Sequence, residues 1–510
     1  RGQVSMSTMV PAPIGGWNSL DPIAAMPPED AVTLENWFPT TLDCELRGGQ
    51  EDYATTITGV VETLTVYTPK DGGEEFFAAS DADVYDISSS GAASAQSLTV
   101  TDGKFQCLNM GDGSNEYLMM FNGVDKPKYY NGTSWVEVDT GTSPGLIGVT
   151  STGIINACIY QKRLFLIEKD KLGFWYLPPN AVGGTVTYYD LSPFADLGGY
   201  LMWAGVWTYD AGDGMDDMIV FMTSQGQVLI YSGTDPSSAS LWSKVGTYYL
   251  GKPLGRRSHV QFAGDLLAIT QNGVYTISEG VQKASINDLV AVTNKIKPTF
   301  NDSARSYGSN FGWEGVAYPY KNALIFNIPV DTSGSQEQYV MNTITGAWCK
   351  FKAWGAQTFC VYNNELYYGG STVVQKAWTG RSDDGTNIVG FGKTAFNHFG
   401  DATQSKRWVL YRPMLQTNGS LSYLTDIDVD FDTTDITGVA DFSPAAGGLW
   451  DTATWDSATW TGSLSTIRRW TSPDASIGYY AAGKLKVETK SVQVKWVAND
   501  YVYETGGVIG

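Results

Sequence analysis

The sequence predicts a mainly β protein with a β-propeller of six or seven blades at its centre. The first observation is a pair of strands joined by a short polar turn, which recurs through residues 64–378. The second is the spacing of the copies, which is irregular but mostly close to the ~40–50 residues of a propeller blade. The third is a composition with 57 Gly and 13% aromatic residues, which suits many strands joined by tight turns. A pair of β-sandwiches, which also contain Gly and Asn turns, is the alternative fold.

Each copy of the repeat has an apolar strand, a polar turn such as Gln271-Asn272-Gly273, and a second apolar strand that contains an aromatic residue. A four-stranded blade cannot bury both of its faces alone, and radial stacking against neighbouring blades solves that problem. The clearest copies are residues 218–231, 266–277 and 358–370, and weaker copies are residues 76–87, 117–130, 163–176 and 323–351.

Three regions follow from this pattern. Residues 1–60 form an N-terminal arm with a short helix and belong to a platform, residues 61–381 form the propeller, and residues 382–510 form a C-terminal β-rich domain. The helix is predicted after Pro28, because proline suits the first helical turn and the acidic residues after it complement the helix dipole. Pro39 is expected to end it.

A second helix is predicted within the propeller, at residues 285–297. Ile286, Leu289 and Ile296 fall on one helical face, with Ser285 as the N-cap. Pro298 is expected to end this helical insertion.

The charge balance argues against a protein that binds DNA tightly. Lys and Arg total 33 against 53 Asp and Glu, so the net charge is −20. Tight DNA binding needs cationic contacts with phosphates, which an acidic surface repels. Transit of DNA without tight binding stays compatible with this charge.

The five cysteines are widely spaced and form no Cys-x-x-Cys, which indicates free thiols in a reducing compartment. We expect no secretion signal and no transmembrane helix, because no apolar run approaches ~18 residues.

An alternating acidic stretch is the richest carboxylate cluster. Asp426, Asp428, Asp430 and Asp432 resemble the start of a calcium loop, but Phe431 stands where that loop needs glycine. Strict alternation instead predicts a solvated strand with four carboxylates on one face, which is a candidate channel-facing strand. A second acidic loop, residues 210–217, is predicted to be a polar turn rather than a calcium site.

Catalytic motifs are weak. Only two histidines are present, His259 and His398, which leaves little for a zinc site or a Ser-His-Asp triad. The stretch 382–386 approaches the turn of sialidase-like propellers but has its glycine one position early. We therefore expect no enzyme activity and no cofactor, and a glycan-binding or glycan-hydrolysing propeller is the alternative.

Several tryptophans are candidate interface residues, because large aromatic side chains anchor protein interfaces. Trp450, Trp455 and Trp460 recur every five residues, a spacing that fits neither a straight helix nor a strand. Packing on their own domain is the alternative role for these three. Trp17 and Trp37 complete the candidate set.

Both ends of the chain resemble one protein family. The opening Gly15-Gly16-Trp17-Asn18-Ser19-Leu20-Asp21, the stretch 34–39, Arg47-Gly48-Gly49 and the ending Tyr503-Glu504-Thr505-Gly506-Gly507 carry the resemblance. They are similar to tail nozzle proteins of short-tailed bacteriophages, also called packaged-DNA stabilisation proteins. The hairpin-rich middle is similar to the propeller of that family.

The resemblance implies a structural virion protein that forms a homohexameric ring at the distal end of the tail tube. Its partners would be the adaptor proteins below the portal, tail fibres or spikes, and double-stranded DNA in transit without tight binding. The channel of the ring would retain packaged DNA and conduct it during ejection. The expected location is the virion tail, after assembly in the host cytoplasm.

Overall fold

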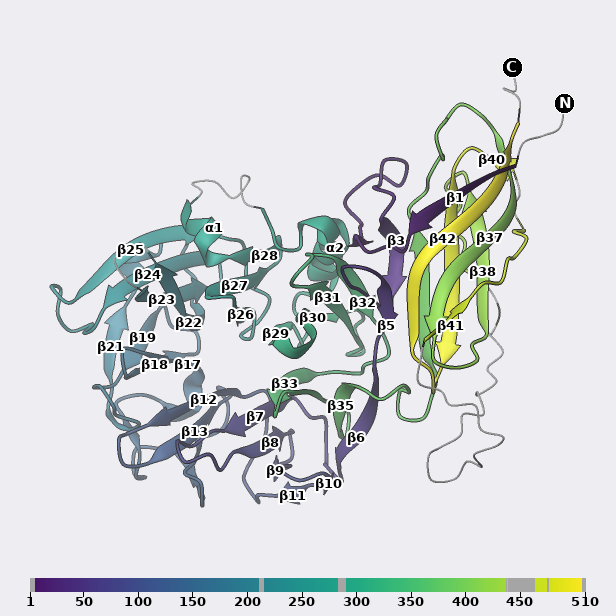
Figure 1. The fold of residues 1–510 in the computed structure, drawn as a ribbon. Coiled ribbons are helices and arrows are strands. Elements are labelled where there is room, and N and C mark those ends of the chain that lie inside the picture. The colour runs from purple at the N-terminus through teal and green to yellow at the C-terminus, as the bar shows by residue number, and fades with distance from the viewer. Residues whose placement is uncertain are drawn as a thin grey trace.

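A computed structural model of the chain describes residues 5–210, 215–282, 290–436, 438, 464–474 and 477–506. These residues form a ring of β-sheets joined to a second, sandwich-like β unit (Figure 1). The mainly β fold class and the β-propeller predicted from the sequence are confirmed.

Among the described residues, six four-stranded blades and one three-stranded sheet surround a common axis. In the first blades the strands run outward in chain order. The first contains β7 (Thr63–Tyr67), β8 (Glu75–Ala79), β9 (Val84–Asp86) and β11 (Ser94–Ala95). The second contains β12 (Gln106–Gly111), β13 (Glu116–Phe121), β14 (Lys128–Tyr130) and β15 (Trp135–Glu137). The third contains β17 (Ile154–Tyr160), β18 (Arg163–Glu168), β19 (Gly173–Tyr176) and β21 (Thr187–Asp190).

The other half of the ring follows the same plan. The next blade contains β22 (Leu201–Asp210), β23 (Met215–Thr223), β24 (Gln227–Gly233) and β25 (Trp242–Tyr249). The three-stranded sheet contains β26 (His259–Phe262), β27 (Asp265–Thr270) and β28 (Gly273–Thr276). The next blade contains β29 (Glu314–Tyr318), β30 (Ala323–Pro329), β31 (Gln336–Asn342) and β32 (Trp348–Phe351). The last contains β33 (Thr358–Tyr362), β34 (Glu365–Gly369) and β35 (Val374–Thr379).

A strand from the N-terminal region closes the ring. β6 (Gly49–Thr55) pairs antiparallel with β35, so it completes the last blade, and the short β10 (Gly91–Ala92) pairs with its outer edge. The innermost strand of the last blade, β33, contacts β7 of the first blade. The sequence placed β6 with the arm, whereas the structure places it in the propeller.

Blade stacking buries the apolar runs on both faces, which explains why they are continuous rather than alternating. In β23, the residues Ile219, Val220, Phe221 and Met222 are all buried. Phe174 of β19 stacks on Phe221, with ring centroids 4.6 Å apart and planes 3° from parallel. Such contacts between neighbouring blades form the core of the ring.

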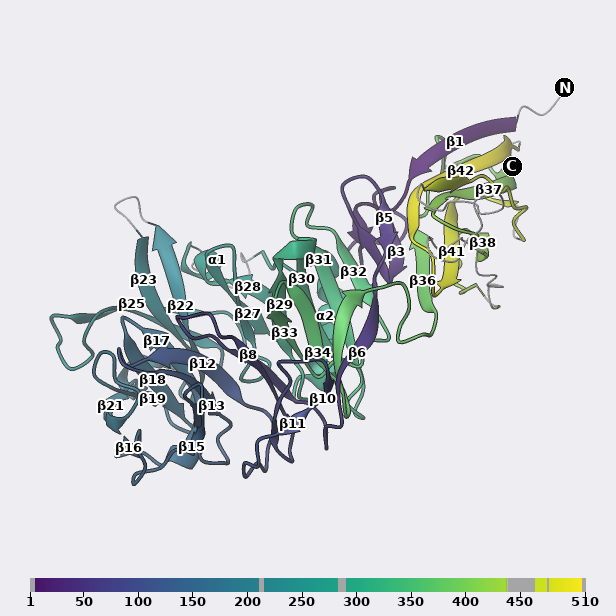
Figure 2. The ribbon, with the colours of Figure 1, turned by 60° about the horizontal axis from the view of Figure 1, so that its bottom comes forward.

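The second β unit consists of two facing sheets (Figure 2). One sheet contains β42 (Val494–Thr505) between β37 (Lys406–Thr417) and two N-terminal elements, β1 (Ser5–Pro11) and the hairpin of β4 (Trp37–Pro39) and β5 (Cys44–Leu46). The short β39 (Ser465–Ile467) and β40 (Ile477–Gly478) pair with β37. The other sheet contains β3 (Asp30–Glu35), β36 (Ile388–Thr394), β41 (Ala481–Thr489) and β38 (Tyr423–Val429).

Glycines in β36 allow the two sheets to approach closely. A Cβ on Gly392 would lie 2.5 Å from the ring of Trp496, and one on Gly390 would lie 2.9 Å from Trp37. Trp37 and Trp496 pack edge to face with ring centroids 5.7 Å apart. The alternating Gly-x-Gly of β36 therefore makes room for two large aromatic side chains.

The propeller and the sandwich share one continuous sheet. β2 (Gly16–Trp17) pairs in parallel with both β32 of the propeller and β3 of the sandwich. One hydrophobic core also spans the junction, from Phe326 in the propeller to Trp496 in the sandwich. Both chain ends thus build the sandwich, and shared sheet and core connect it to the ring.

The prediction of a helix after Pro28 is wrong. Residues 30–35 form β3, which pairs with β36, and Asn36 adopts a positive φ of 59° before β4 begins. Pairing with neighbouring strands outweighs the weak local helix signal of proline and acidic residues.

The prediction of a helical insertion at residues 285–297 is correct that helices occur there but wrong about their bounds. The described helices near it are α1 (Ile277–Gln282), η4 (Asn294–Ile296) and α2 (Lys297–Tyr307). Pro298 lies in the first turn of α2, where it begins a helix instead of ending one. Residues 283–289 lie outside the described residues.

Short elements fill the remaining connections. β16 (Leu146–Ile147) pairs with β20 (Gly184–Thr185), and single 3-10 turns occur at η1 (Ser151–Gly153), η2 (Ser192–Phe194) and η5 (Pro319–Lys321). None of the described helices has the length and apolar character needed to cross a membrane.

Candidate functional site at the propeller axis

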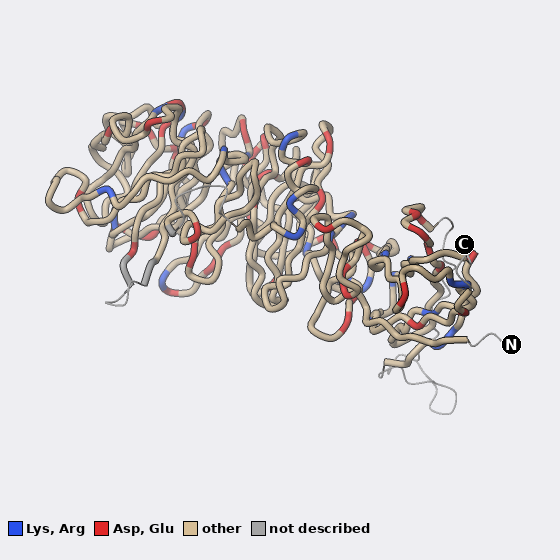
Figure 3. The backbone as a smooth tube through the Cα atoms, turned by 90° about the horizontal axis from the view of Figure 1, so that it is seen from above, with Lys and Arg blue, Asp and Glu red and all other residues tan. Residues whose placement is uncertain are grey.

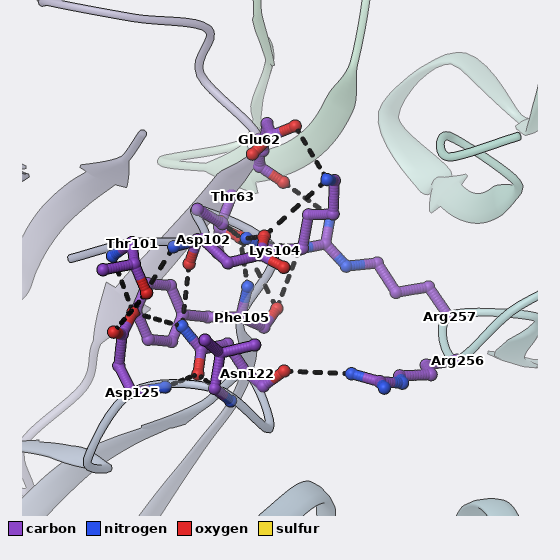
Figure 4. A network of polar contacts seen from close by, with 12 residues as sticks. Glu62, Thr63, Thr101, Asp102, Lys104, Phe105, Asn122, Asp125, Arg256 and Arg257 are labelled. Atoms are coloured by element: carbon purple, nitrogen blue, oxygen red, sulfur yellow. Dashed lines mark hydrogen bonds and ion pairs between the residues drawn. The ribbon is translucent and has the colours of Figure 1, made fainter. Parts of the chain in front are cut away.

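The segments that lead into the innermost strands meet at one end of the propeller axis. The segments before β7, β12, β26, β29 and β33 all contribute to a polar cluster there. Two consecutive arginines, Arg256 and Arg257, enter the cluster from the connection between β25 and β26 (Figure 4).

Arg257 reaches three of these segments through the hydrogen bonds below, and a fourth through its ion pair with Glu314. Its Nη1 donates hydrogen bonds to the Glu62 carbonyl at 2.8 Å and to Thr358 Oγ1 at 3.1 Å. Its Nη2 donates to Thr63 Oγ1 at 2.6 Å and to the Phe105 carbonyl at 2.8 Å. Because its partners belong to β7, β33 and the approach to β12, this guanidinium ties several blades together at the axis.

Glu314, at the start of β29, is the carboxylate partner of Arg257. Nη1 of Arg257 lies 3.3 Å from Glu314 Oε2, and the side chains are 14% and 11% exposed. Burial raises the pKa of Glu314, and the nearby Arg257 charge opposes that rise. The Phe359 amide and Thr358 hydroxyl also donate hydrogen bonds to this carboxylate, so its charge is well compensated.

Lys104 forms the second set of ion pairs. Its Nζ lies 3.4 Å from Glu62 Oε1 and 3.7 Å from Asp102 Oδ1. Burial raises the pKa of Glu62, while the Lys104 charge counteracts it. Lys104 and Arg257 each lie 5.2 Å from the ring centroid of Phe311, a cation–π distance.

Arg256 differs from these two cations. Its Nη1 donates one hydrogen bond, 2.9 Å long, to the carbonyl of Asn122, and no described carboxylate lies within ion-pair distance. Burial lowers its pKa. Asn122 is itself fixed, because its Nδ2 donates to the Asp102 carbonyl and to Asp125, each at 2.8 Å.

A cavity of about 440 Å³ opens between these groups. Its lining contains three cationic side chains, one carboxylate, and several neutral polar and apolar groups. These residues are Asp102, Lys104, Gln106, Leu254, Gly255, Arg256, Arg257 and Ser309 to Trp313.

The cluster offers cationic hydrogen-bond donors and holds most of its charges in ion pairs. In the part of the chain that the structure describes, no three His, Cys, Asp or Glu side chains are arranged to hold a metal ion. The cavity lining includes no histidine or cysteine, and its lone carboxylate faces an ion-pair partner. The arrangement holds charges in place and presents hydrogen-bond donors.

The acidic stretch at residues 426–432 was predicted to be a solvated strand, and the structure differs from that prediction. β38 ends at Val429, and Asp430 and Phe431 both have positive φ, so the alternation stops halfway. Asp428 is buried and pairs with Lys393 at 2.9 Å and Lys484 at 2.5 Å.

The outer members of the stretch have other roles. Asp426 lies 3.8 Å from Lys484, Asp430 accepts hydrogen bonds from the amides of Tyr479 and Tyr480, and Asp432 accepts one from Thr434. Lysines on neighbouring strands, invisible in a local reading of the sequence, neutralise the acidic face. That these carboxylates face a channel in an assembly stays a prediction.

Two of the predicted interface tryptophans are buried within the chain. Trp17 packs edge to face on Tyr339 at 5.1 Å, and Lys350 lies 5.1 Å from its ring. Trp37 is 0% exposed between the sheets of the sandwich. Both therefore join parts of one subunit and are not available to a partner, which corrects that prediction. Trp450, Trp455 and Trp460 lie outside the described residues.

Three further residues that the sequence analysis singled out have contacts within the fold. His259 stacks on Trp203 with ring centroids 4.5 Å apart, and burial lowers its pKa to about 4. His398 contacts Tyr480 edge to face. Asp383, in the stretch compared with the sialidase turn, forms a buried ion pair with Arg47. All five cysteines are free, as predicted.

Sequence reasoning missed the axial cluster. The available signal was Gly255-Arg256-Arg257-Ser258, an arginine pair directly before a strand in a chain with few cations. The local sequence alone cannot distinguish such an arginine pair from a solvated turn. Its partners lie 57 to 195 residues away along the chain, so only the closed ring brings them together.

The solved structures that are similar to this chain have low sequence identities and TM-scores below 0.5. No family model and no curated protein matches the chain. Among solved structures, BBS1N in complex with ARL6DN is 12% identical over 65% of this chain and 96% of its own, with a TM-score of 0.39. Raptor from Chaetomium thermophilum is 11% identical over 65% of this chain and 29% of its own, with a TM-score of 0.37. YCF48 from Cyanidioschyzon merolae is 10% identical over 64% of this chain and 98% of its own, with a TM-score of 0.29.

Proposed function

We propose that the chain is a structural subunit of a bacteriophage tail nozzle. In this role several copies form a closed ring that ends the tail tube, retains packaged DNA and conducts it during ejection. Its partners are the adaptor proteins above the ring, and fibres or spikes beside it.

The observation that carries the proposal is the sandwich built from both chain ends. β1 pairs with β42 over seven residues, and β3 pairs with β36, so arm and C-terminal segment form one unit outside the propeller. A subunit of two β units joined by a shared sheet and core resists bending at the junction. That property suits the wall of a tube that contains DNA under pressure.

The side chains at one end of the propeller axis support the same role. The Arg257 guanidinium and the Phe311 ring lie together at one end of the axis. The major groove of double-stranded DNA alone is ~12 Å wide, so a duplex cannot pass an axis that these side chains bridge. In the proposed ring, the conduit is therefore the space enclosed by several subunits, and each propeller is a wall element.

The charge of the chain supports transit of DNA without tight binding. The chain has a net charge of −20, and acidic residues are spread over both the propeller and the sandwich (Figure 3). Many of the cations are held by carboxylates within the subunit, as Lys393 and Lys484 are by Asp428. Because acidic residues outnumber basic ones by 53 to 33, the chain as a whole repels the phosphates of DNA.

Electron microscopy of the purified chain, alone and mixed with rings of its adaptor, tests the proposal. We expect closed rings of uniform diameter, with adaptor rings stacked coaxially on one face. A preparation of the adaptor alone is the control for stacking. A chain that stays monomeric at all concentrations and ignores the adaptor would overturn the proposal, as would turnover of a glycan substrate.

A further inference from the structure

We infer that the cavity at the propeller axis binds an anionic group, a carboxylate or a phosphate, through Arg256. This inference goes beyond the proposed function and does not depend on it. It rests on one cation without a carboxylate in contact, on the residues that line the cavity, and on the donors that surround it.

Arg256 is the cation whose pairing is incomplete. Lys104 has Glu62 and Asp102 as carboxylate partners, and Arg257 has Glu314. Arg256 has a single neutral acceptor, the carbonyl of Asn122, so its Nε and Nη2 have no partner in the described part of the chain. Asp102 and Asp170 act on Arg256 only from beyond contact distance. A part-buried guanidinium with no carboxylate in contact loses hydration that is not fully replaced, and an anion would restore that balance.

The lining of the cavity has more basic than acidic side chains, although the protein is acidic. Three cations and one carboxylate line it, whereas acidic residues outnumber basic ones by 53 to 33 in the whole chain. With Asp102 as its only lining carboxylate, the cavity lacks the oxygen ligands that a divalent cation needs. Glu62 and Glu314 lie outside the lining as partners of Lys104 and Arg257, so the attraction for an anion comes from Arg256 and not from the net charge of the cluster.

Further donors can complete the contact. Gln106 and Ser309 line the cavity, and their side chains make no hydrogen bond to the described residues. Gly255 and Gly312 also line it, and both have positive φ, which brings backbone close to the cavity without a side chain between. Arg256 would supply the charge, and these groups would orient the bound oxygens.

The size of the cavity suits a small molecule or the tip of an acidic side chain. Its volume of about 440 Å³ falls within the ~300–1,000 Å³ of small-ligand pockets. It reaches solvent, because the side chains of Lys104 and Asp102 are 40% and 29% exposed. An anionic group attached to a larger ligand can therefore enter without rearrangement of the blades.

Isothermal titration calorimetry of the full chain tests the inference, with inorganic phosphate and succinate as separate probes and sodium chloride at matched ionic strength as the reference. We expect saturable binding of one probe or both. Stronger phosphate binding identifies a phosphate-bearing ligand, and stronger succinate binding identifies a carboxylate-bearing one. Absence of saturable binding by either probe overturns the inference.

Variants tie the binding to this cavity. Arg256→Gln should weaken binding at least tenfold, whereas Arg256→Lys should retain part of it. Arg305→Gln is the matched control, because that side chain is 75% exposed on α2. Unchanged binding by a folded Arg256→Gln variant would contradict the inference.

A second variant covers the case in which Arg256→Gln does not fold. Gln106→Glu places a carboxylate in the cavity lining and removes no hydrogen bond within the chain. It should weaken binding of either anion about tenfold by repulsion, and circular dichroism should show an unchanged fold. Equal affinity in Gln106→Glu and the unmodified chain would place the anion elsewhere and overturn the inference.

Discussion

Arg47 and Asp383 form a bidentate ion pair at the junction between propeller and sandwich. Nη1 of Arg47 lies 2.8 Å from Asp383 Oδ1, and Nη2 lies 2.7 Å from Oδ2. Arg47 stands between β5 and β6, and Asp383 stands between β35 and β36. The pair therefore clamps the two places where the chain crosses between its two units.

Breaking this pair should destabilise the chain strongly. The side chains of Arg47 and Asp383 are 0% and 6% exposed, so Arg47→Met or Asp383→Leu leaves a buried charge without its partner. We expect each to lower the free energy of unfolding by about 3–5 kcal/mol. The double variant should lose less than the sum of the two, because no charge is then left unpaired.

Urea unfolding measures these effects, and Asp384→Asn is the matched control. Asp384 is exposed and follows Asp383 directly, so its change should stay within about 0.5 kcal/mol. Strictly additive losses in the double variant would show that the two side chains act independently.

Arg257→Gln should loosen the propeller at its axis. The substitution removes four hydrogen bonds to Glu62, Thr63, Phe105 and Thr358 and leaves Glu314 without its cation. A loss of about 3 kcal/mol or more is expected, because a buried carboxylate is left uncompensated.

Hydrogen exchange shows where that loss acts. Exchange should accelerate at the starts of β7 and β33 and stay unchanged in the distant sandwich. Uniform acceleration over the whole chain, or a loss below about 1 kcal/mol, would contradict a local role of Arg257 at the axis.

Asp428→Asn should destabilise the sandwich. Lys393 and Lys484 are 2% and 6% exposed at their side chains, and this carboxylate is the nearest counter-charge of both, with Asp426 3.8 Å from Lys484. Two buried ammonium groups would then share a neutral amide, for an expected loss of about 3–5 kcal/mol. Asp432→Asn, an exposed member of the same acidic stretch, should change stability by less than about 0.5 kcal/mol.

Limited proteolysis tests the same two variants, Asp428→Asn and Asp432→Asn. Asp428→Asn should expose cleavage sites after residue 382 first, while the propeller fragment persists. Equal resistance of the two variants would mean that the lysines find other counter-charges.

The thiols should be protected in the folded chain. Cys44 and Cys349 are buried, and burial raises the pKa of both thiols well above the usual value. Burial likewise raises the pKa of Cys107 to about 11 and those of Cys158 and Cys360 to about 12. A thiol reagent at pH 8 should react slowly with native chain and rapidly with all five thiols in denaturant. Rapid reaction of the native chain would contradict this protection.

The parts of the fold that the sequence predicted are those defined by neighbours in the chain. Hairpins such as β23 with β24 and β27 with β28 appear as an apolar run, a polar turn and a second run, so local pattern suffices to find them. The same local pattern failed at residues 30–35, because β3 gains its structure from β36 and β32, more than 300 residues away.

The candidate site was less accessible to sequence reasoning for a similar reason. The partners of Arg257 and of Asp428 come from other strands, so the sequence shows an arginine pair and an acidic run without their counter-charges. Trp17 and Trp37 were wrongly predicted to be interface residues because large aromatic side chains suit both a core and an interface. Only the burial of the side chain in the folded chain distinguishes a core residue from an interface residue.

His259 makes the stability of the fold depend on pH. Its ring stacks on Trp203, and its Nδ1 is buried without a hydrogen-bond partner in the described residues. Burial lowers its pKa from 6.5 to about 4, so as the pH falls the unfolded chain takes up a proton before the folded chain does. The contribution of neutral His259 to stability is therefore complete above pH 6.5 and is lost between pH 6.5 and about 4.

His259→Phe removes this dependence and keeps an aromatic ring against Trp203. Urea unfolding at pH 7, 6 and 5 should show the variant close to the unmodified chain at pH 7 and increasingly more stable than it toward pH 5. The advantage should approach at most about 3 kcal/mol near pH 4, because each unit of pKa shift corresponds to about 1.4 kcal/mol. Other titrating groups are common to both chains and cancel in the difference. A difference that stays constant over this range would mean that His259 is protonated equally easily in the folded and unfolded chains.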